Sequence, residues 1–162
     1  MISSTSQPRA DEVQAIYRAT SELAELTPRS HETLEELAKG NRLAVIRVDG
    51  KLAGWAAVEP LTRNLSELGM VFVKPEYRGA ESFDALIREV AKRSERILLA
   101  TYNPALIRYA MRAWKGREIG LGTAIVLSRG KFLTKRLGAS SRKSIQARLK
   151  TSRPRYALIE RR

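Results

Sequence analysis

A β-hairpin between residues 42 and 58 is the feature of this sequence that most restricts its fold. Residues 42–48 (RLAVIRV) contain three β-branched side chains, and residues 51–58 (KLAGWAAV) follow as a second apolar run. Asp49-Gly50 lies between them and is a strong signal for a two-residue turn, because the turns that join antiparallel strands need backbone angles that Asp and Gly adopt readily. The chain is therefore expected to contain an antiparallel sheet.

Helical and extended segments alternate along the rest of the chain. Hydrophobic spacing predicts helices over residues 10–25, 81–96 and 104–116, a helix that Ser30 caps and Gly40 ends, and a short helix around 143–150. Apolar runs predict strands over residues 65–73, 97–102, 118–127 and 155–159. The chain shows no internal repeat and no second domain, and its only shift in composition is the basic one near Ser128, so these elements predict one α/β (α+β) domain over residues 1–162.

The positive charge is concentrated near the C-terminus. The chain has 30 Lys and Arg against 17 Asp and Glu, a net charge of +13, and residues 128–162 hold twelve basic residues and one acidic residue, a net charge of +11. Such a concentration attracts nucleic acid or acidic protein surfaces, although a solvated surface that keeps the protein in solution is the plain alternative.

The basic segment over residues 128–162 has few aromatic side chains. Phe132 and Tyr156 are its only rings, so it suits contact with a phosphate backbone better than stacking on bases. The residues expected to bind a polyanion are Lys135, Arg136, Arg142, Lys143, Arg148, Lys150, Arg153 and Arg155.

Several kinds of site and location are disfavoured by what the chain lacks. It has no cysteine and a single histidine, His31, so neither a zinc site nor a histidine-based triad is expected, and no metal is predicted. No stretch approaches about 18 uninterrupted apolar residues, and the first residues do not read as a secretory signal. We expect a soluble, cytoplasmic protein with no membrane partner.

Residues 67–79 (ELGMVFVKPEYRG) place a strand directly before a predicted helix. Together with the order of the elements, and with Asn103 opening an apolar helix after a strand, this segment resembles the fourth strand and pyrophosphate loop of the GNAT N-acetyltransferase superfamily. The resemblance covers about residues 10–127. It implies a mixed, mostly antiparallel central sheet flanked by helices, and it implies binding of acetyl-CoA or another acyl-CoA.

The resemblance also assigns a cofactor site. A strand that runs into the start of a helix leaves backbone N–H groups without partners, and these favour an anion such as a pyrophosphate. This chain departs from the family pattern at Glu81 and Phe83, where the family has small residues: a carboxylate repels a pyrophosphate and a bulky ring narrows the approach. The residues implied to bind the cofactor are Val71, Phe72, Val73, Arg78, Gly79, Ala80, Ser82 and Asn103.

Candidate catalytic groups follow from the same resemblance. Glu67 falls where many family members keep a carboxylate that acts as general base, and it reads equally well as a strand residue on the solvent face. The position of the family's general-acid tyrosine is Ala110 here, with Tyr109 one place earlier. One residue turns a helical side chain by about 100°, so Tyr109 also reads as a core residue, and Tyr102 at the end of the preceding strand is the second candidate.

Two functions from different classes fit these observations. The first is an acyl-CoA-dependent N-acyltransferase, with acetyl as the expected acyl group. Its acceptor would be an amine on a polyanion such as tRNA, DNA or an acidic protein associated with nucleic acid. The second is a GNAT-like protein that lost acetyl transfer and binds or modifies nucleic acid through its basic C-terminal segment. The sequence leaves the acceptor, the acyl donor and the oligomeric state open, a dimer included.

Overall fold

The computed structural model describes all residues except 24, 25, 27, 137–153 and 161–162. The described strands are β1 (Ile2–Thr5), β2 (Leu43–Val48), β3 (Lys51–Pro60), β4 (Leu65–Val73), β5 (Arg96–Thr101), β6 (Arg117–Ile119) and β7 (Arg155–Glu160). The described helices are α1 (Ala10–Glu22), α2 (His31–Lys39), the 3-10 helix η1 (Pro75–Tyr77), α3 (Ala80–Ala91), α4 (Pro104–Ala113), α5 (Leu121–Leu127) and α6 (Lys131–Arg136).

The strands form one mixed sheet in the order β1-β2-β3-β4-β5-β7-β6. β4 and β5 pair in parallel, whereas β1–β2, β2–β3, β5–β7 and β6–β7 are antiparallel. A mostly antiparallel sheet with helices beside it is the predicted fold class, which is confirmed. Two compact units divide the chain: unit 1 consists of residues 1–58 and 69–93, and unit 2 of residues 59–68 and 94–162.

The predicted hairpin forms the centre of unit 1. Asp49 and Gly50 have φ angles of 49° and 79°, the left-handed angles that a two-residue turn between antiparallel strands requires. The register runs from Val48 opposite Lys51 to Leu43 opposite Ala57. β1 adds an unpredicted third strand along β2. Its sequence, ISST, is too short and too polar to signal a strand on its own.

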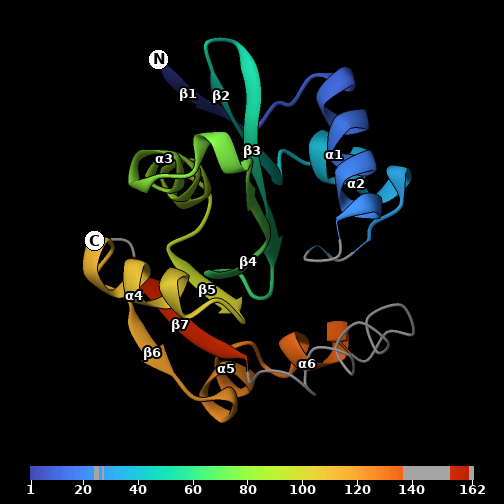
Figure 1. Ribbon diagram of the computed structural model, residues 1–162. Coiled ribbons are helices and arrows are strands. Elements are labelled where there is room, and N and C mark those ends of the chain that lie inside the picture. The colour runs from blue at the N-terminus through green and yellow to red at the C-terminus, as the bar shows by residue number, and fades with distance from the viewer. Residues whose placement is uncertain (24–25, 27, 137–153, 161–162) are drawn as a thin grey trace. The chain divides into compact units, whose positions relative to one another are not determined.

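Helices cover both faces of the strands of unit 1. Figure 1 shows α1 and α2 on one side of β2 and β3, and α3 on the other. The core between the sheet and α1–α2 includes Ile16, Leu34, Leu43 and Trp55, none more than 1% exposed. The cap predicted for α2 is present, because the Ser30 hydroxyl accepts a hydrogen bond from the amide of Thr33 at 3.1 Å.

β3 and β4 approach each other closely at Gly54. A Cβ on this residue would lie 2.6 Å from the carbonyl oxygen of Phe72 and 3.2 Å from the Cα of Val73. A real side chain cannot occupy that position without moving the backbone of β4. Gly54 therefore sets the separation of the two strands at the point where β4 ends.

An ion pair joins α1 to β2 inside unit 1. Arg47 donates from Nε to Glu12 Oε1 at 2.6 Å and from Nη2 to Glu12 Oε2 at 2.7 Å, and the backbone amide of Arg9 donates to Oε2 at 2.7 Å. The Glu12 side chain is 2% exposed and the Arg47 side chain 18%. The carboxylate thus has several donors to compensate for its burial, as a buried charge requires.

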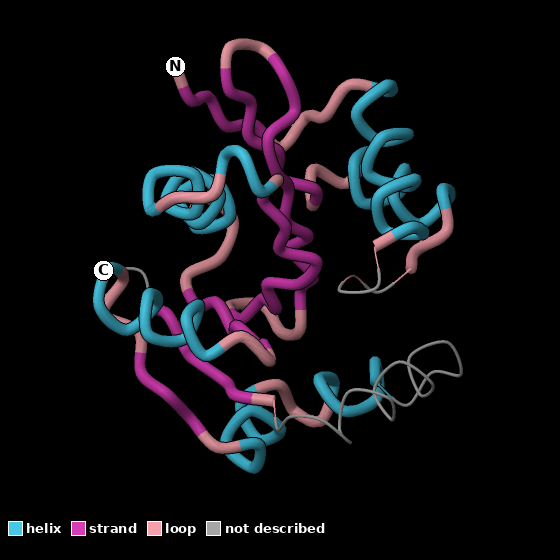
Figure 2. Tube along the Cα trace, in the orientation of Figure 1, coloured by secondary structure: helices cyan, strands magenta, loops and turns pink. Residues whose placement is uncertain are grey.

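Unit 2 is built on the strands β5, β7 and β6, drawn in magenta in Figure 2. The first half of β4 pairs with β5, with Leu65 opposite Arg96, and β5 pairs with β7, with Ile97 opposite Ile159. α4 packs against all three of these strands. Leu98, Leu158 and Phe132 are among the residues of the unit's core.

The strand predicted over residues 118–127 is wrong. Only Arg117–Ile119 form a strand, and Gly120 is the N-cap of α5. The apolar run LGTAIVL has no strict alternation, so its composition fits a short helix as well as a strand. The helix predicted around residues 143–150 lies outside the described residues. In the described part of the chain, no helix has the length and apolar character needed to cross a membrane.

Candidate functional site

The C-terminal end of β4 in unit 1 has a second edge besides the one toward β3, because among the described residues the ladder to β5 covers only Leu65–Leu68. Lys74 donates its amide to the carbonyl of Ala53 on β3 at 2.9 Å, so the backbone groups of Phe72 face β3 as well, by the alternation of a strand. The N–H groups of Val71 and Val73 then point to the opposite edge. Both residues are among those that the family resemblance implies to bind the cofactor.

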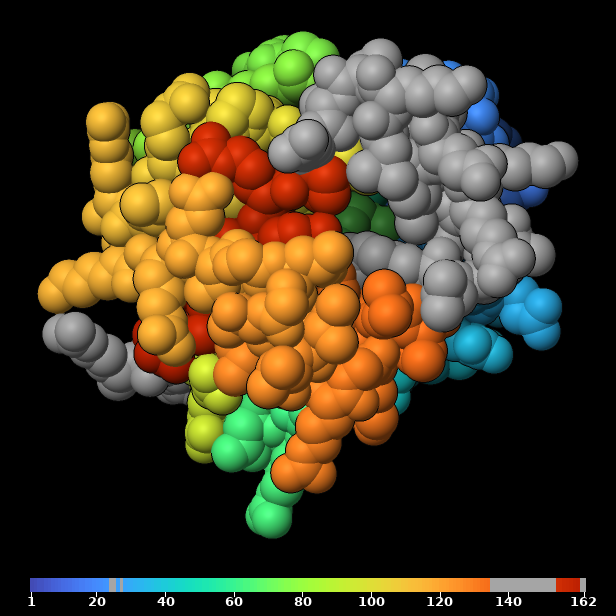
Figure 3. All heavy atoms as spheres, turned by 90° about the horizontal axis from the view of Figure 1, so that it is seen from below, coloured from blue at the N-terminus to red at the C-terminus, as the bar shows by residue number. Residues whose placement is uncertain are grey.

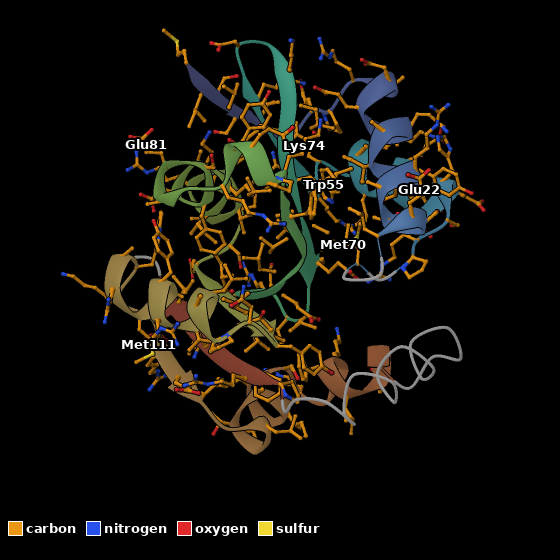
Figure 4. All side chains as sticks on the ribbon, viewed as in Figure 1. Glu22, Trp55, Met70, Lys74, Glu81 and Met111 are labelled. Carbon is orange, nitrogen blue, oxygen red and sulfur yellow. The ribbon has the colours of Figure 1, made fainter. Side chains whose placement is uncertain are left out.

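Met70 precedes this edge with a left-handed backbone. Its φ is 52°, a region that bulky residues rarely adopt. The ladder between β4 and β5 covers Leu65–Leu68, all before this irregularity. The side chain of Met70 packs against the core of α1, α2 and β3, and Figure 4 shows it on the same side of β3 as α1 and α2. The irregularity therefore separates the half of β4 that pairs with β5 from its C-terminal end.

Trp55 fixes the end of β4 from the neighbouring strand. Its ring packs on that of Phe72 with centroids 4.6 Å apart, and it is 1% exposed. Its indole Nε1 is buried and has no hydrogen-bond partner among the described residues. The apolar runs of both predicted strands were the available signal for a contact between them, but sequence gives no register between β3 and β4.

Arg78 folds back over the end of β4. Its Nε donates to the carbonyl oxygen of Val73 at 3.0 Å, and its guanidinium carbon lies 6.0 Å from the centre of the Phe72 ring. A cation at that distance from an aromatic face is attracted to it. The short helix η1 lies between Val73 and Arg78 and makes this return possible, so Arg78 stands at the base of the loop, and its contact with a cofactor stays a prediction.

The start of α3 completes the loop. Gly79 is the N-cap residue, and a Cβ on it would meet nothing within 4 Å, so its backbone is open to close approach. The hydroxyl of Ser82 donates to the carbonyl of Tyr77 at 2.7 Å and is therefore committed to holding η1 against α3. The first-turn amides, to which Ala80 and Ser82 belong, project from the start of the helix.

Glu81 and Phe83 are placed differently from the expectation that both would obstruct the loop. The Phe83 ring is buried, with 7% exposure, in the core beneath α3. The expectation that this ring narrows the approach is therefore wrong, because a helix turns residue 83 toward the sheet. Glu81 is exposed in the first turn of α3, and Figure 4 shows it at the outer surface of the helix. Its carboxylate lies where solvent screens it.

The candidate catalytic residues belong to unit 2. Glu67 is half-buried and lies opposite Leu98 in the β4–β5 ladder. Tyr102, also half-buried, follows β5 four residues beyond Leu98, which is about 13 Å along an extended strand. Tyr109 is half-buried on α4 beside the fully buried Ala110. These positions leave the catalytic roles of all three residues as predictions.

Asn103 has a structural role at the start of α4. Its side-chain oxygen accepts a hydrogen bond from the amide of Ala105 at 2.9 Å, and its own amide donates to the Thr101 hydroxyl at 3.0 Å. Pro104 follows at the first helical position. The predicted N-cap is confirmed, and the contact with an acyl-CoA stays a prediction.

Exchanging the cap of α4 separates these two roles of Asn103. We expect Asn103→Ala to lower the free energy of unfolding by about 1 kcal/mol and Asn103→Ser to change it by a few tenths, because serine also caps helices. Urea unfolding followed by circular dichroism measures both. If the serine variant is as stable as the wild type and still loses affinity for CoA, the carboxamide contacts the cofactor. Equal losses of stability in both variants would contradict the cap assignment.

Among the residues predicted to bind a polyanion, only the side chain of Arg155 is described. It forms an exposed two-point ion pair with Glu118 on β6, Nε to Oε1 at 2.6 Å and Nη2 to Oε2 at 2.7 Å. The hydrogen bond from Arg155 lowers the pKa of Glu118. Lys135 and Arg136 belong to α6, with side chains outside the described set. Arg142, Lys143, Arg148, Lys150 and Arg153 lie outside the described residues.

No metal centre accompanies this loop within the described part of the chain, where no group of three His, Asp or Glu residues is arranged to hold an ion.

Comparison with known proteins gives a match to one family. The family model described as Acetyltransferase (GNAT) family matches residues 10–113. None of the curated proteins matches the sequence.

Solved structures share the fold at low identity. Rv2747 from Mycobacterium tuberculosis, solved in complex with CoA and NLQ, is 15% identical with a TM-score of 0.68 and covers 99% of this chain and 98% of its own. The ribosomal-protein-S18-alanine N-acetyltransferase from Escherichia coli is 21% identical with a TM-score of 0.56, over 74% of this chain and 80% of its own.

A longer protein contains the same fold as one part. N-acetylglutamate synthase from Neisseria gonorrhoeae, complexed with coenzyme A and N-acetyl-glutamate, is 16% identical with a TM-score of 0.64. The match covers 100% of this chain, which spans 35% of that protein.

Proposed function

This chain belongs to the GNAT acetyltransferase family, and we propose that it transfers an acetyl group from acetyl-CoA to an amine. The observation that carries the proposal is the loop between β4 and α3, where the second edge of β4, an arginine and the start of a helix follow one another within unit 1. Two of the structural neighbours were solved with CoA, which supports the choice of donor.

The residues of the loop suit the pyrophosphate of CoA. The first-turn amides of α3 offer donors to an anion at the positive end of the helix. Gly79 leaves room for the phosphate oxygens to reach the backbone, and Arg78 supplies a cation at the same place. Because the Phe83 ring is in the core, it leaves this approach open.

The second edge of β4 suits the reacting end of the donor. Acetyl-CoA would supply the acetyl group as a thioester. The N–H groups of Val71 and Val73 would donate to the carbonyl oxygen as negative charge develops on it, which is the largest single contribution in many acyl transfers. In this proposal Glu67 accepts a proton from the amine, and Tyr109 or Tyr102 donates one to the leaving sulfur.

Calorimetric titration with acetyl-CoA, and then with CoA, tests the donor. We expect micromolar binding that Arg78→Ala weakens about tenfold or more, because a charge-assisted hydrogen bond to phosphate is lost. Arg88→Ala is the matched control, since Arg88 is an exposed arginine at the other end of α3, and it should leave the affinity unchanged. No binding at millimolar concentration would end the acetyltransferase proposal.

For the acceptor we propose an amine on a polyanion, such as a nucleic acid or a protein associated with it. The net charge of +13 is the observation that favours this choice, because a positive field raises the local concentration of anionic substrates. The second candidate is a protein of the same fold that binds nucleic acid without acetyl transfer. Nucleic-acid binding in the absence of CoA binding would favour this second candidate.

A further inference from the structure

The net charge of the chain belongs entirely to one of its two units. Unit 1 contains twelve basic and twelve acidic residues and is neutral, whereas unit 2 contains eighteen basic and five acidic residues and carries the whole +13. Thirteen of those eighteen cations are arginines, whose planar guanidinium matches phosphate geometry. Figure 3 shows long side chains of the segment coloured yellow to orange, which runs from α4 to α5, extending outward.

The acidic side chains of β6 and β7 are already used. Glu118 holds Arg155 through two hydrogen bonds. Oε1 of Glu160 lies 3.1 Å from Nε of Arg96 and 3.8 Å from Nη2 of Arg117. α4 packs against the strands that carry these two carboxylates. Neither of these two carboxylates is therefore available to form an ion pair with the cations of α4.

Three cations follow the outer side of α4, and we call them the α4 ridge: Arg108, Arg112 and Lys115. All three are exposed, and none forms an ion pair within the described part of the chain. The opposite side of the helix buries Ile107 and Ala110, so the ridge faces solvent. No Asp or Glu occurs in the sequence between Arg96 and Arg117.

The spacing of the ridge is unfavourable for the helix by itself. Arg108 and Arg112 are one turn apart, about 6 Å along the axis, and like charges so placed weaken a helix by a few tenths of a kcal/mol. Cations near a helix C-terminus are favourable, which accounts for Arg112 and for Lys115 just beyond the last turn. It does not account for Arg108, the fifth of the ten residues of α4.

We propose that unit 2 binds the sugar-phosphate backbone of a nucleic acid through the α4 ridge. This inference deepens the acceptor part of the proposed function and rests on that part alone. A row of cations with two arginines suits successive phosphates, which accept paired hydrogen bonds from a guanidinium. Met111 is the exposed large apolar residue of α4, at 42% exposure, so the helix lacks the broad apolar face that a membrane surface requires.

Fluorescence anisotropy with the full-length chain and a labelled short single-stranded RNA or duplex DNA tests the ridge without acetyl-CoA. We expect the triple variant R108E/R112E/K115E to bind at least about tenfold more weakly. Between about 50 and 200 mM salt, the negative slope of the logarithm of the binding constant against the logarithm of the salt concentration should become shallower by about 2 to 3, because three phosphate contacts are lost. Melting temperatures of all variants show that they fold.

The matched control is R18E/R42E/K51E, which makes the same charge change at three exposed positions of unit 1. Equal losses in both triple variants would overturn the proposal, because net charge and not the ridge would then govern binding. Binding of poly-glutamate or of anionic vesicles in preference to nucleic acid would overturn it too. Calorimetry with CoA on R108E/R112E/K115E should match the wild type, so a failure of the ridge and a failure of the acetyl-CoA site are distinguishable.

Discussion

Replacing Gly54 by alanine is expected to lower the free energy of unfolding by about 3 kcal/mol, at the upper end of what overpacking a core produces. The new methyl group would lie 2.6 Å from the carbonyl oxygen of Phe72, which is backbone and cannot rotate away. β3 and β4 would have to separate there. Because the same stretch of β4 carries Val71 and Val73, we also expect weaker binding of CoA at temperatures where the variant is folded.

Gly69→Ala provides the control for this substitution. Gly69 belongs to β4, and a Cβ placed on it meets nothing within 4 Å, so its replacement should change the free energy of unfolding by less than about 1 kcal/mol. Urea unfolding of both variants by circular dichroism compares them directly. If Gly54→Ala were as stable as Gly69→Ala, the close approach of β3 and β4 would be contradicted.

Replacing Glu12 by glutamine is expected to lower the free energy of unfolding by about 3 kcal/mol at neutral pH, the size found when one partner of a buried ion pair is removed. Arg47 would keep a charge that is 18% exposed and would lose both of its carboxylate bonds. Glu35→Gln removes the partner of Lys39 in an exposed pair and should change stability by less than about 0.5 kcal/mol.

The contribution of Glu12 also depends on pH. Burial would by itself raise the pKa of this carboxyl group, but the hydrogen bonds from Arg47 and from the Arg9 amide outweigh burial and lower the pKa. A group with a lowered pKa in the folded state stabilises the protein fully above its unfolded pKa, and this stabilisation is lost as the pH falls through the folded value. The wild type should therefore lose its advantage over Glu12→Gln below about pH 4.5.

Unfolding midpoints of the wild type and Glu12→Gln at neutral and acidic pH measure this difference. A constant difference across the acid range would contradict the assignment of the charge to Glu12. The double variant Glu12→Met/Arg47→Met should recover much of the lost stability, because an apolar pair of similar size needs no desolvation of charge.

The local elements of this fold were predictable, whereas the contacts between them were not. Asp49-Gly50, Ser30 and Asn103 act through neighbouring residues, and each forms the turn or cap that its sequence predicts. The strand β1 escaped prediction because its stability comes from pairing with β2, more than forty residues away. The helix α5 escaped because an apolar run of seven residues carries no period that separates a helix from a strand.

The candidate site likewise has features that the sequence predicts and features that depend on contacts between elements. The position of the loop from Arg78 to Ser82 follows from the order strand, turn and helix, which the sequence displays. The direction of the Phe83 ring depends on which side of α3 meets the sheet, and sequence alone suggested an obstruction that is absent. Lone glycines within strands often mark close approach of another backbone, so Gly54 was a signal that could have been used.

The neutrality of unit 1 and the excess charge of unit 2 make ionic strength act on this protein in two opposite ways. Unit 2 has eighteen cations and only five anions, so the repulsion among its excess cations raises the free energy of its folded state at low salt. Salt at about 0.1 M screens charges more than about 10 Å apart, so it should make unit 2 harder to unfold while it weakens any hold on a polyanion. A bound polyanion would have the same stabilising effect as salt, so unit 2 would be least stable in dilute buffer without a partner.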